Sequence, residues 1–226
     1  MTKSRLDNPF TKGQIAEFYA RYNHMYHAYQ DALVAFTGLV SLESKVLEIG
    51  VGTGAFTNLL FSTGYDVNGI DRSEEMLKRS PQRVRVLSEQ CDLLDYNPSK
   101  KYDVVVSHSG GFTFKRGKFE TYYQEEDDLE KAFQKIHAIL GSRGEFFINK
   151  AEHDDKIDLG DGKKLSIKQE DNENSRVYTY TFRLNGDEIT QKQRRLVFSQ
   201  NELQEISSSY FSWNFDHNRW IVGEKK

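Results

Sequence analysis

The sequence predicts an α/β protein built around a mostly parallel sheet. Short apolar runs alternate with helical stretches from residue 45 to residue 150, and a glycine-rich turn joins the first of these strands to the first helix. The run YDVVVS (102–107) has three consecutive valines, as expected of a central strand covered on both faces. Strands and helices that alternate in this way require parallel strands with right-handed crossovers.

Composition and charge favour a small-molecule substrate. The 226 residues suit one domain with some elaboration, and 31 basic against 34 acidic side chains give no global attraction to nucleic acid or to anionic membranes. No window approaches 18 consecutive apolar residues, and the start MTKSRLDNPF lacks the apolar core of a secretory signal, so we expect a cytoplasmic protein. Cys91 is the only cysteine, and we expect no metal site.

The first half of the chain predicts a helical segment followed by a βαβ unit. Apolar and aromatic residues recur at spacings of three and four between 10 and 40, which predicts one or two amphipathic helices within 1–42. A strand at 46–49, a helix ending at Gly64 and a strand at 66–71 complete the βαβ unit. Ser73 is expected to cap the next helix through its hydroxyl.

The second half predicts further strands and then a change of pattern. We expect strands at VRVL (84–87), 102–107 and EFFIN (145–149), with a helix before Gly141. The turn signals DG and NG, flanked by alternating runs, predict an antiparallel insertion at 151–198. A capping box, Ser199 with Glu202, predicts a helix, and two strands around a tight turn complete residues 199–226.

Three predicted strand ends offer groups that suit a nucleoside. The turn Gly50-Val51-Gly52-Thr53-Gly54 provides backbone angles closed to other residues and lets a ligand lie against the backbone. Asp71 ends the next strand, where a carboxylate can accept hydrogen bonds from both ribose hydroxyls. Asp92 follows a third strand and suits the edge of an adenine ring. Ligands of open α/β sheets bind at these carboxyl ends.

Five segments occur in an order that is similar to a known family: VLEIGVGTG (46–54), GIDRSEEML (69–77), QCDLLDY (90–96), YDVVVSHSG (102–110) and LGSRGEFFI (140–148). Together they resemble class I S-adenosylmethionine-dependent methyltransferases of small-molecule type. The resemblance implies a Rossmann-like, doubly wound sheet of seven strands with residues 43–150 as the cofactor-binding core. It also implies S-adenosylmethionine as cofactor and S-adenosylhomocysteine as product.

The resemblance further implies a role for each residue at this edge. The glycines at 50, 52 and 54 lie under the methionine part of the cofactor, and Glu48 faces its amino group. The other implied contacts are Asp71 to the ribose, Arg72 and Met76 beside the adenine, Asp92 and the Leu93 amide at the adenine edge, and Ser107 near the sulfonium.

Catalytic and acceptor-binding residues are hypotheses of the same kind. His108 is the first candidate for a general base, because imidazole titrates near neutral pH and follows the fourth strand; His153 is the second. Structural hydrogen bonding is the alternative for His108. The N-terminal helix resembles a lid, with Tyr22 over the cofactor and Tyr26 and Tyr29 against the acceptor, whereas simple core packing is the alternative.

We therefore predict a single domain, 1–226, that transfers a methyl group to oxygen or nitrogen of a small metabolite, as a monomer or homodimer, with no nucleic-acid or membrane partner. Methylation of a protein or peptide side chain is an alternative that predicts an open groove. A non-catalytic S-adenosylmethionine-binding regulator is another. The motif set disfavours a nicotinamide-dependent oxidoreductase, and the sequence SHSG at 107–110 departs from the corresponding motif of DNA amine methyltransferases.

Overall fold

A computed structural model describes residue 20 and residues 29–108, 110–151, 156–158, 164–184 and 187–226. The main sheet has seven strands, as predicted, and five of them are parallel. The two C-terminal strands run antiparallel at one edge. The order across the sheet is β12 (Phe211–Asn214), β13 (Trp220–Lys225), β7 (Leu140–Asn149), β4 (Tyr102–Ser107), β1 (Lys45–Ile49), β2 (Asp66–Asp71) and β3 (Ser88–Gln90).

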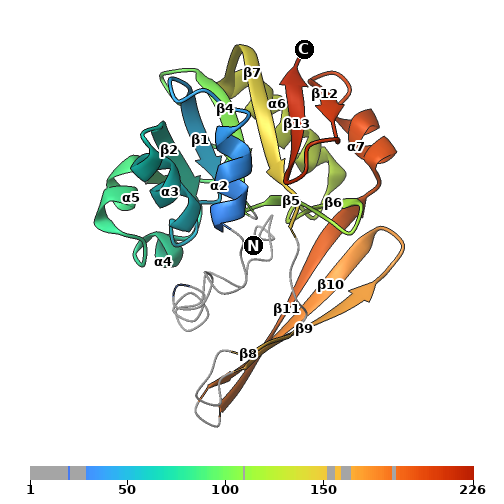
Figure 1. Cartoon of the computed structure of the whole chain (residues 1–226). Coiled ribbons are helices and arrows are strands. Elements are labelled where there is room, and N and C mark those ends of the chain that lie inside the picture. The colour runs from blue at the N-terminus through green and yellow to red at the C-terminus, as the bar shows by residue number, and fades with distance from the viewer. Residues whose placement is uncertain (1–19, 21–28, 109, 152–155, 159–163, 185–186) are drawn as a thin grey trace.

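Helices cover both faces of this sheet, so the predicted doubly wound architecture is confirmed (Figure 1). One apolar core joins α2 (Tyr29–Thr37) and α3 (Ala55–Thr63) to the sheet around Phe36, Phe56 and Trp220, all nearly or fully buried. The core on the other face is built around α6 (Glu126–Ile139). The remaining helices are α4 (Glu74–Leu77), α5 (Gln82–Leu87) and α7 (Gln200–Ile206).

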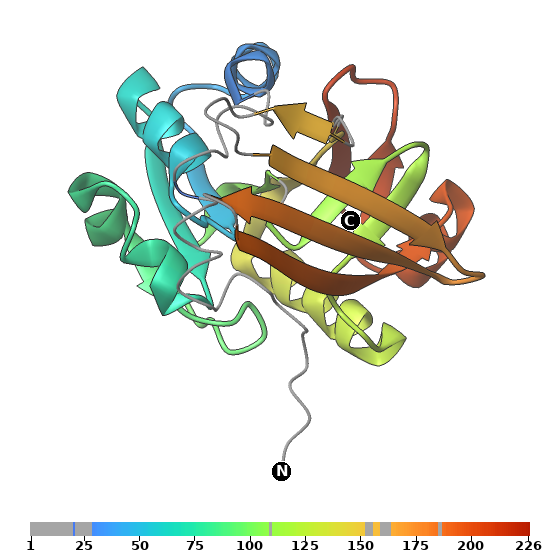
Figure 2. The same cartoon turned by 90° about the horizontal axis from the view of Figure 1, so that it is seen from below.

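A second, antiparallel sheet lies across the carboxyl ends of the parallel strands (Figure 2). Its order is β5 (Phe112–Lys115), β6 (Lys118–Thr121), β11 (Asp187–Phe198), β10 (Ser175–Leu184), β9 (Lys164–Asp171) and β8 (Lys156–Asp158). The predicted insertion at 151–198 supplies four of these strands. The hairpin β5–β6, which follows β4 directly, was missed in the sequence and links the two sheets.

Residues 84–87, predicted as a strand, are helical. Pro81, with φ of −54°, stands at the start of α5, and the edge strand β3 begins only at Ser88. The alternating run VRVL fits either structure locally, but the helix buries Val84 and leaves Val86 80% exposed. Packing of Val84 against the glycine turn therefore prevailed over the β preference of valine.

Both predicted C-terminal elements are present. Ser199 and Glu202 make the reciprocal hydrogen bonds of a capping box at the start of α7. β12 and β13 pair antiparallel around the predicted turn. Within the described residues, no helix is long and apolar enough to cross a membrane. The described part of the chain also contains no group of three His, Cys, Asp or Glu side chains placed to hold a metal ion.

Candidate active site

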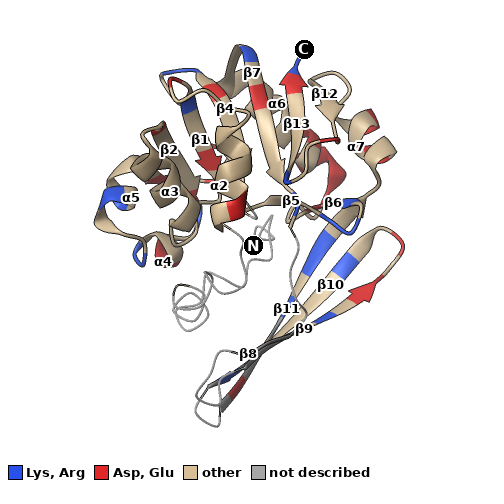
Figure 3. Ribbon diagram, in the orientation of Figure 1, with Lys and Arg blue, Asp and Glu red and all other residues tan. Residues whose placement is uncertain are grey.

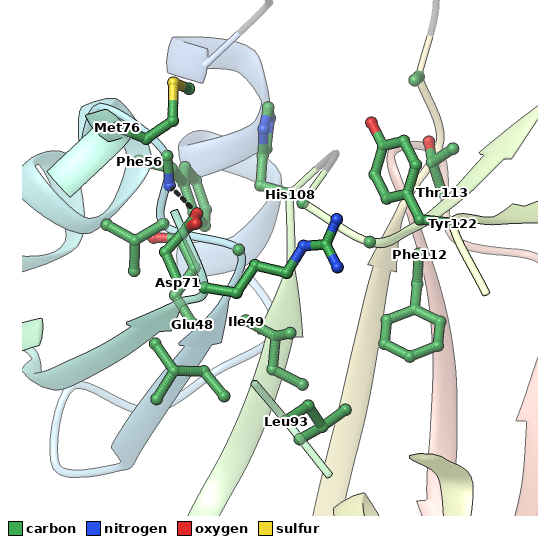
Figure 4. Close-up of a pocket in the computed structure, with 18 of the residues that line it drawn as sticks. Glu48, Ile49, Phe56, Asp71, Met76, Leu93, His108, Phe112, Thr113 and Tyr122 are labelled. Atoms are coloured by element: carbon green, nitrogen blue, oxygen red, sulfur yellow. Dashed lines mark hydrogen bonds between the residues drawn. The ribbon is translucent and has the colours of Figure 1, made fainter. Parts of the chain in front are cut away.

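A pocket lies between the carboxyl edge of the main sheet and one face of the second sheet. Figure 4 shows Asp71 and Met76 on one side of it and Thr113 and Tyr122 on the other. Of the residues expected at the site, the structure brings together Tyr29, Glu48, Gly50, Gly52, Asp71, Arg72, Met76, Asp92, Leu93 and His108.

The glycine turn has the backbone conformation that its sequence predicts. Gly50, Gly52 and Gly54 have φ values of 76°, 59° and 81°, in the left-handed region that favours glycine. Gly50 and Gly52 line the pocket. The structure does not bring Gly54 to the pocket wall: a Cβ there would lie 2.6 Å from a methyl of Val84, so this glycine allows α5 to pack against the start of α3.

Asp71 is held by the backbone at the end of β2. One carboxylate oxygen accepts the Gly52 amide at 2.7 Å (Figure 4). The other accepts the Ser73 amide at 2.7 Å. Burial raises the pKa of Asp71, and the two amide hydrogen bonds oppose this shift. The two amides fix the orientation of the carboxylate, and each oxygen keeps a lone pair for a hydroxyl donor in the pocket.

Glu48 is buried at 1% exposure near the end of β1. The Thr57 hydroxyl donates a hydrogen bond to its carboxyl group. Burial raises the pKa of Glu48 to about 8, with a further contribution from Asp71, and the Thr57 hydrogen bond opposes the shift. Glu48 is therefore mostly protonated at neutral pH, and a cationic ligand group beside it would favour its ionised form.

Both apolar and charged residues line the part of the pocket beside the ends of β2 and β3. Met76 and Leu93 are buried and line the pocket. The Asp92 carboxylate accepts the amide of Leu94 at 3.0 Å, which fixes the turn after β3. Burial lowers the pKa of Arg72, while the nearby Asp92 and Asp71 favour its charged form. This arrangement suits a flat ring between Met76 and Leu93 with polar edges near Asp92.

His108 is packed between two aromatic rings rather than exposed. Its ring centroid lies 4.7 Å from that of Tyr29 and 4.8 Å from that of Phe56, and both pairs are stacked. The residue as a whole is 6% exposed and lines the pocket. Ser107, by contrast, is fully buried and does not line the pocket. Its hydroxyl donates to the Phe112 carbonyl at 3.0 Å and accepts the Phe112 amide at 3.3 Å.

The opposite wall comes from the second sheet. The family resemblance implies that the insertion, at about 157–197, forms this wall, but none of its side chains was predicted individually, and the contribution of β5 was not expected. The lining side chains of this wall include Thr113, Lys115, Tyr178, Tyr180 and Arg195. The alternating run VYTYTFRL (177–184) places Tyr178 and Tyr180 on one face, but no sequence signal tells which face covers the pocket. Three further predicted site residues, Tyr22, Tyr26 and His153, lie outside the described residues.

Comparisons with known proteins agree with this geometry. Residues 46–144 match the family model of a methyltransferase domain. Malonyl-[acyl-carrier protein] O-methyltransferase 1 of Ilyobacter polytropus is 26% identical over 153 residues, which are 63% of this chain and 50% of that protein. The chain spans about half or less of the length of the curated relatives it matches.

Solved structures match nearly the whole chain. An S-adenosylmethionine-dependent methyltransferase from Clostridium acetobutylicum has a TM-score of 0.65 at 14% identity, covering 94% of this chain and 97% of that one. The sugar N-methyltransferase KedS8 of Streptoalloteichus has a TM-score of 0.68 at 13% identity, covering 100% and 98%. Residues 46–144 therefore form a methyltransferase domain, and the chain has the Rossmann-like fold of class I S-adenosylmethionine-dependent methyltransferases.

Proposed function

We propose that this protein transfers a methyl group from S-adenosylmethionine to an oxygen or nitrogen atom of a small-molecule metabolite. The observation that best supports this function is the composition of the pocket wall. Groups suited to a nucleoside come from the main sheet, and tyrosines with two cations come from the second sheet, so the two sides of one pocket suit two chemically different ligands.

The residues on the main-sheet side fit S-adenosylmethionine. Gly50 and Gly52 leave the backbone open to a ligand, and the carboxylate of Asp71 is oriented to accept ribose hydroxyls. Glu48 suits the amino group of the methionine part, and Met76 and Leu93 offer apolar contacts to adenine.

When bound, the cofactor supplies an electrophilic methyl group attached to a positively charged sulfur. The chain must then align the acceptor atom with this methyl group and exclude water. We assign this alignment to the second-sheet wall and to Tyr29. His108 is our candidate for removing a proton from the acceptor; its stacked position fixes the ring plane.

The position of the second sheet favours a small-molecule acceptor over a protein side chain. A peptide needs an open groove, whereas the second sheet lies across the carboxyl edge of the first (Figure 2). The names of the similar proteins include an O-methyltransferase and a sugar N-methyltransferase, which supports oxygen and nitrogen as acceptor atoms. We expect a monomer or homodimer and no nucleic-acid partner.

Calorimetric titration with S-adenosylmethionine and S-adenosylhomocysteine tests the cofactor, with NADH as the control. We expect micromolar binding of the first two and none of NADH. An acceptor screen with labelled methyl donor follows. If the protein binds neither S-adenosylmethionine nor S-adenosylhomocysteine, the proposal is contradicted. If it binds them but methylates no metabolite, peptide or protein, the alternative of a non-catalytic S-adenosylmethionine-binding regulator is favoured.

A further inference from the structure

Glu48 is a buried carboxyl group that lines the main-sheet side of the pocket. It stands one residue before the end of β1 and is only 1% exposed. Figure 4 shows it on the same side of the pocket as Asp71. In the neighbouring strands β2 and β4 the residues opposite Glu48 are Gly69 and Val106, which carry no charge. A counter-charge for Glu48 must therefore come from the helix layer or from the pocket itself.

The helix beside Glu48 offers it a hydroxyl group but no charge. The segment AFTNLLFST, which forms α3, contains no acidic or basic residue (Figure 3). From this helix the Thr57 hydroxyl donates a hydrogen bond to the Glu48 carboxyl group. Within the described part of the chain, no lysine, arginine or histidine forms an ion pair with Glu48. Ionisation of Glu48 would therefore bury a charge that has only a neutral partner, which is costly in free energy.

Other titratable groups line this side of the pocket on the elements around β1. They are Tyr29 of α2, Asp71 and Arg72 at the end of β2, Asp92 after β3 and His108 after β4. The charge of Asp71 disfavours an ionised Glu48, and the charge of Arg72 is favoured by Asp92 and Asp71. Burial and the like charge of Asp71 both favour the neutral acid, and the pKa of Glu48 is raised to about 8.

The cofactor that we assign to this pocket carries a positive charge suited to Glu48. The amino group of its methionine part is protonated at neutral pH, and the family resemblance places this group at Glu48. An ammonium group next to the carboxyl group favours the ionised form and donates hydrogen bonds to its oxygens. A counter-ion for Glu48 thus arrives with the ligand, and the balance between its neutral and charged forms changes on binding.

We propose that Glu48 selects ligands with an ammonium group by giving up its own proton when they bind. In the free protein Glu48 is a neutral acid. On binding, its O–H bond breaks, the proton passes to the solvent, and the carboxylate accepts hydrogen bonds from the ammonium group of the ligand. This inference rests on the proposed function and adds a specificity-determining step to it. A nucleoside without an ammonium group leaves Glu48 protonated, so only the complete cofactor or its product releases this proton.

The test counts the protons that the full chain releases when it binds S-adenosylhomocysteine. Calorimetric titrations at about pH 6.5, where the ligand's amino group is charged, are repeated in buffers with different heats of ionisation. The dependence of the measured heat on the buffer gives the number of protons released. The comparison ligand is 5′-methylthioadenosine, which has the same nucleoside and a thioether but no amino-acid part. The variants are Glu48→Gln and a matched control, Glu43→Gln, at an exposed carboxylate shortly before β1.

We expect S-adenosylhomocysteine to release about one proton more than 5′-methylthioadenosine does. Its affinity should therefore rise with pH by up to about tenfold per unit more steeply than that of 5′-methylthioadenosine, as long as Glu48 is protonated in the free protein. In Glu48→Gln both differences between the ligands should disappear, because a glutamine side chain has no acidic proton. Glu43→Gln should behave as the wild type does. A Glu48 that only supports the fold would affect neither measurement.

Two results would overturn this inference and leave the proposed function intact. The first is binding of S-adenosylhomocysteine to the wild type with no more proton release than 5′-methylthioadenosine causes, because Glu48 would then not change its charge. The second is an undiminished difference between the ligands in Glu48→Gln, because another group would then supply the proton. If Glu48→Gln does not fold, the wild-type proton counts still decide. Failure of the wild type to bind S-adenosylhomocysteine contradicts the proposed function and this inference together.

Discussion

The hydroxyl of Tyr178 lies 2.8 Å from both carboxylate oxygens of Glu120. The carboxylate is fully buried in the second sheet and also faces the guanidinium groups of Arg176 and Arg195. Burial raises the pKa of Tyr178, and the negative charge of Glu120 raises it further, so the phenol stays neutral and donates. One buried carboxylate thus connects strands β6, β10 and β11 behind the pocket wall that the second sheet forms.

Removing this carboxylate should destabilise the protein strongly. Glu120→Ala leaves two buried guanidinium groups without their shared partner, and we expect a loss of about 3–5 kcal/mol in the free energy of unfolding. Glu188→Ala is the control, because its salt bridge with Arg183 at 2.8 Å is exposed and worth about 0–1 kcal/mol. Urea unfolding measures both, and similar losses in the two variants would contradict this account.

The stability of the protein should decrease as pH rises through the range in which Glu48 titrates. The pKa of Glu48 is about 8 in the folded protein and 4.5 in the reference state. Between these values the folded state keeps a proton that the unfolded state releases, so this group lowers stability by up to about 1.4 kcal/mol per pH unit.

Glu48→Gln should remove this dependence, because glutamine is neutral and nearly isosteric. We expect the unfolding free energy of the variant to exceed that of the wild type by an amount that grows from pH 5 to pH 8. Glu43→Gln, at an exposed carboxylate shortly before the same strand, should keep the wild-type profile. Parallel profiles for Glu48→Gln and wild type would show that Glu48 is already ionised.

Asp71→Ala should weaken cofactor binding. The change removes the carboxylate to which we assign the ribose hydroxyls, and we expect S-adenosylhomocysteine affinity to fall roughly 10- to 150-fold. Asp66→Ala is the matched control at the opposite end of β2, where the carboxylate is exposed and lies 3.6 Å from Lys100. Calorimetry compares the two, and unchanged affinity in Asp71→Ala rules out the ribose role.

His108→Phe separates chemistry from packing at the pocket wall. Phenylalanine keeps an aromatic ring between Tyr29 and Phe56 but has no proton acceptor, so we expect turnover to fall about 100-fold or more. Cofactor affinity and melting temperature should change little. His137→Phe, at a half-buried histidine on α6, is the control. Normal turnover in His108→Phe would limit His108 to packing.

The sequence predicts the main sheet well because its signals are local. Three valines in β4 require burial on both faces, and the glycine turn after β1 requires angles that few other residues adopt. Residues 84–87 show the limit of such signals, because an alternating run of four residues fits a helix turn as well as a strand. Contact between Val84 and Gly54, 30 positions earlier in the chain, decides between them.

The candidate site likewise contains residues that local sequence signals predict and residues that only long-range contacts bring together. Asp71 and Asp92 could be assigned to one edge because parallel strands end together. Arg195 and Tyr122 could not, since they are 73 positions apart and meet only through the register of β6 against β11. The hairpin β5–β6 carried a weak signal, the turn Arg116-Gly117, where both residues have positive φ.

Gly50 and Gly110 set a boundary for redesign. A Cβ built on Gly50 would lie 2.1 Å from the Gly110 carbonyl oxygen, and a Cβ on Gly110 would lie 2.4 Å from the Gly50 carbonyl oxygen. The glycine turn and the connection that leads into β5 therefore touch through backbone atoms alone. A chimaera that exchanges the second sheet should therefore join after residue 111, because an earlier junction replaces Gly110 and with it half of this backbone contact.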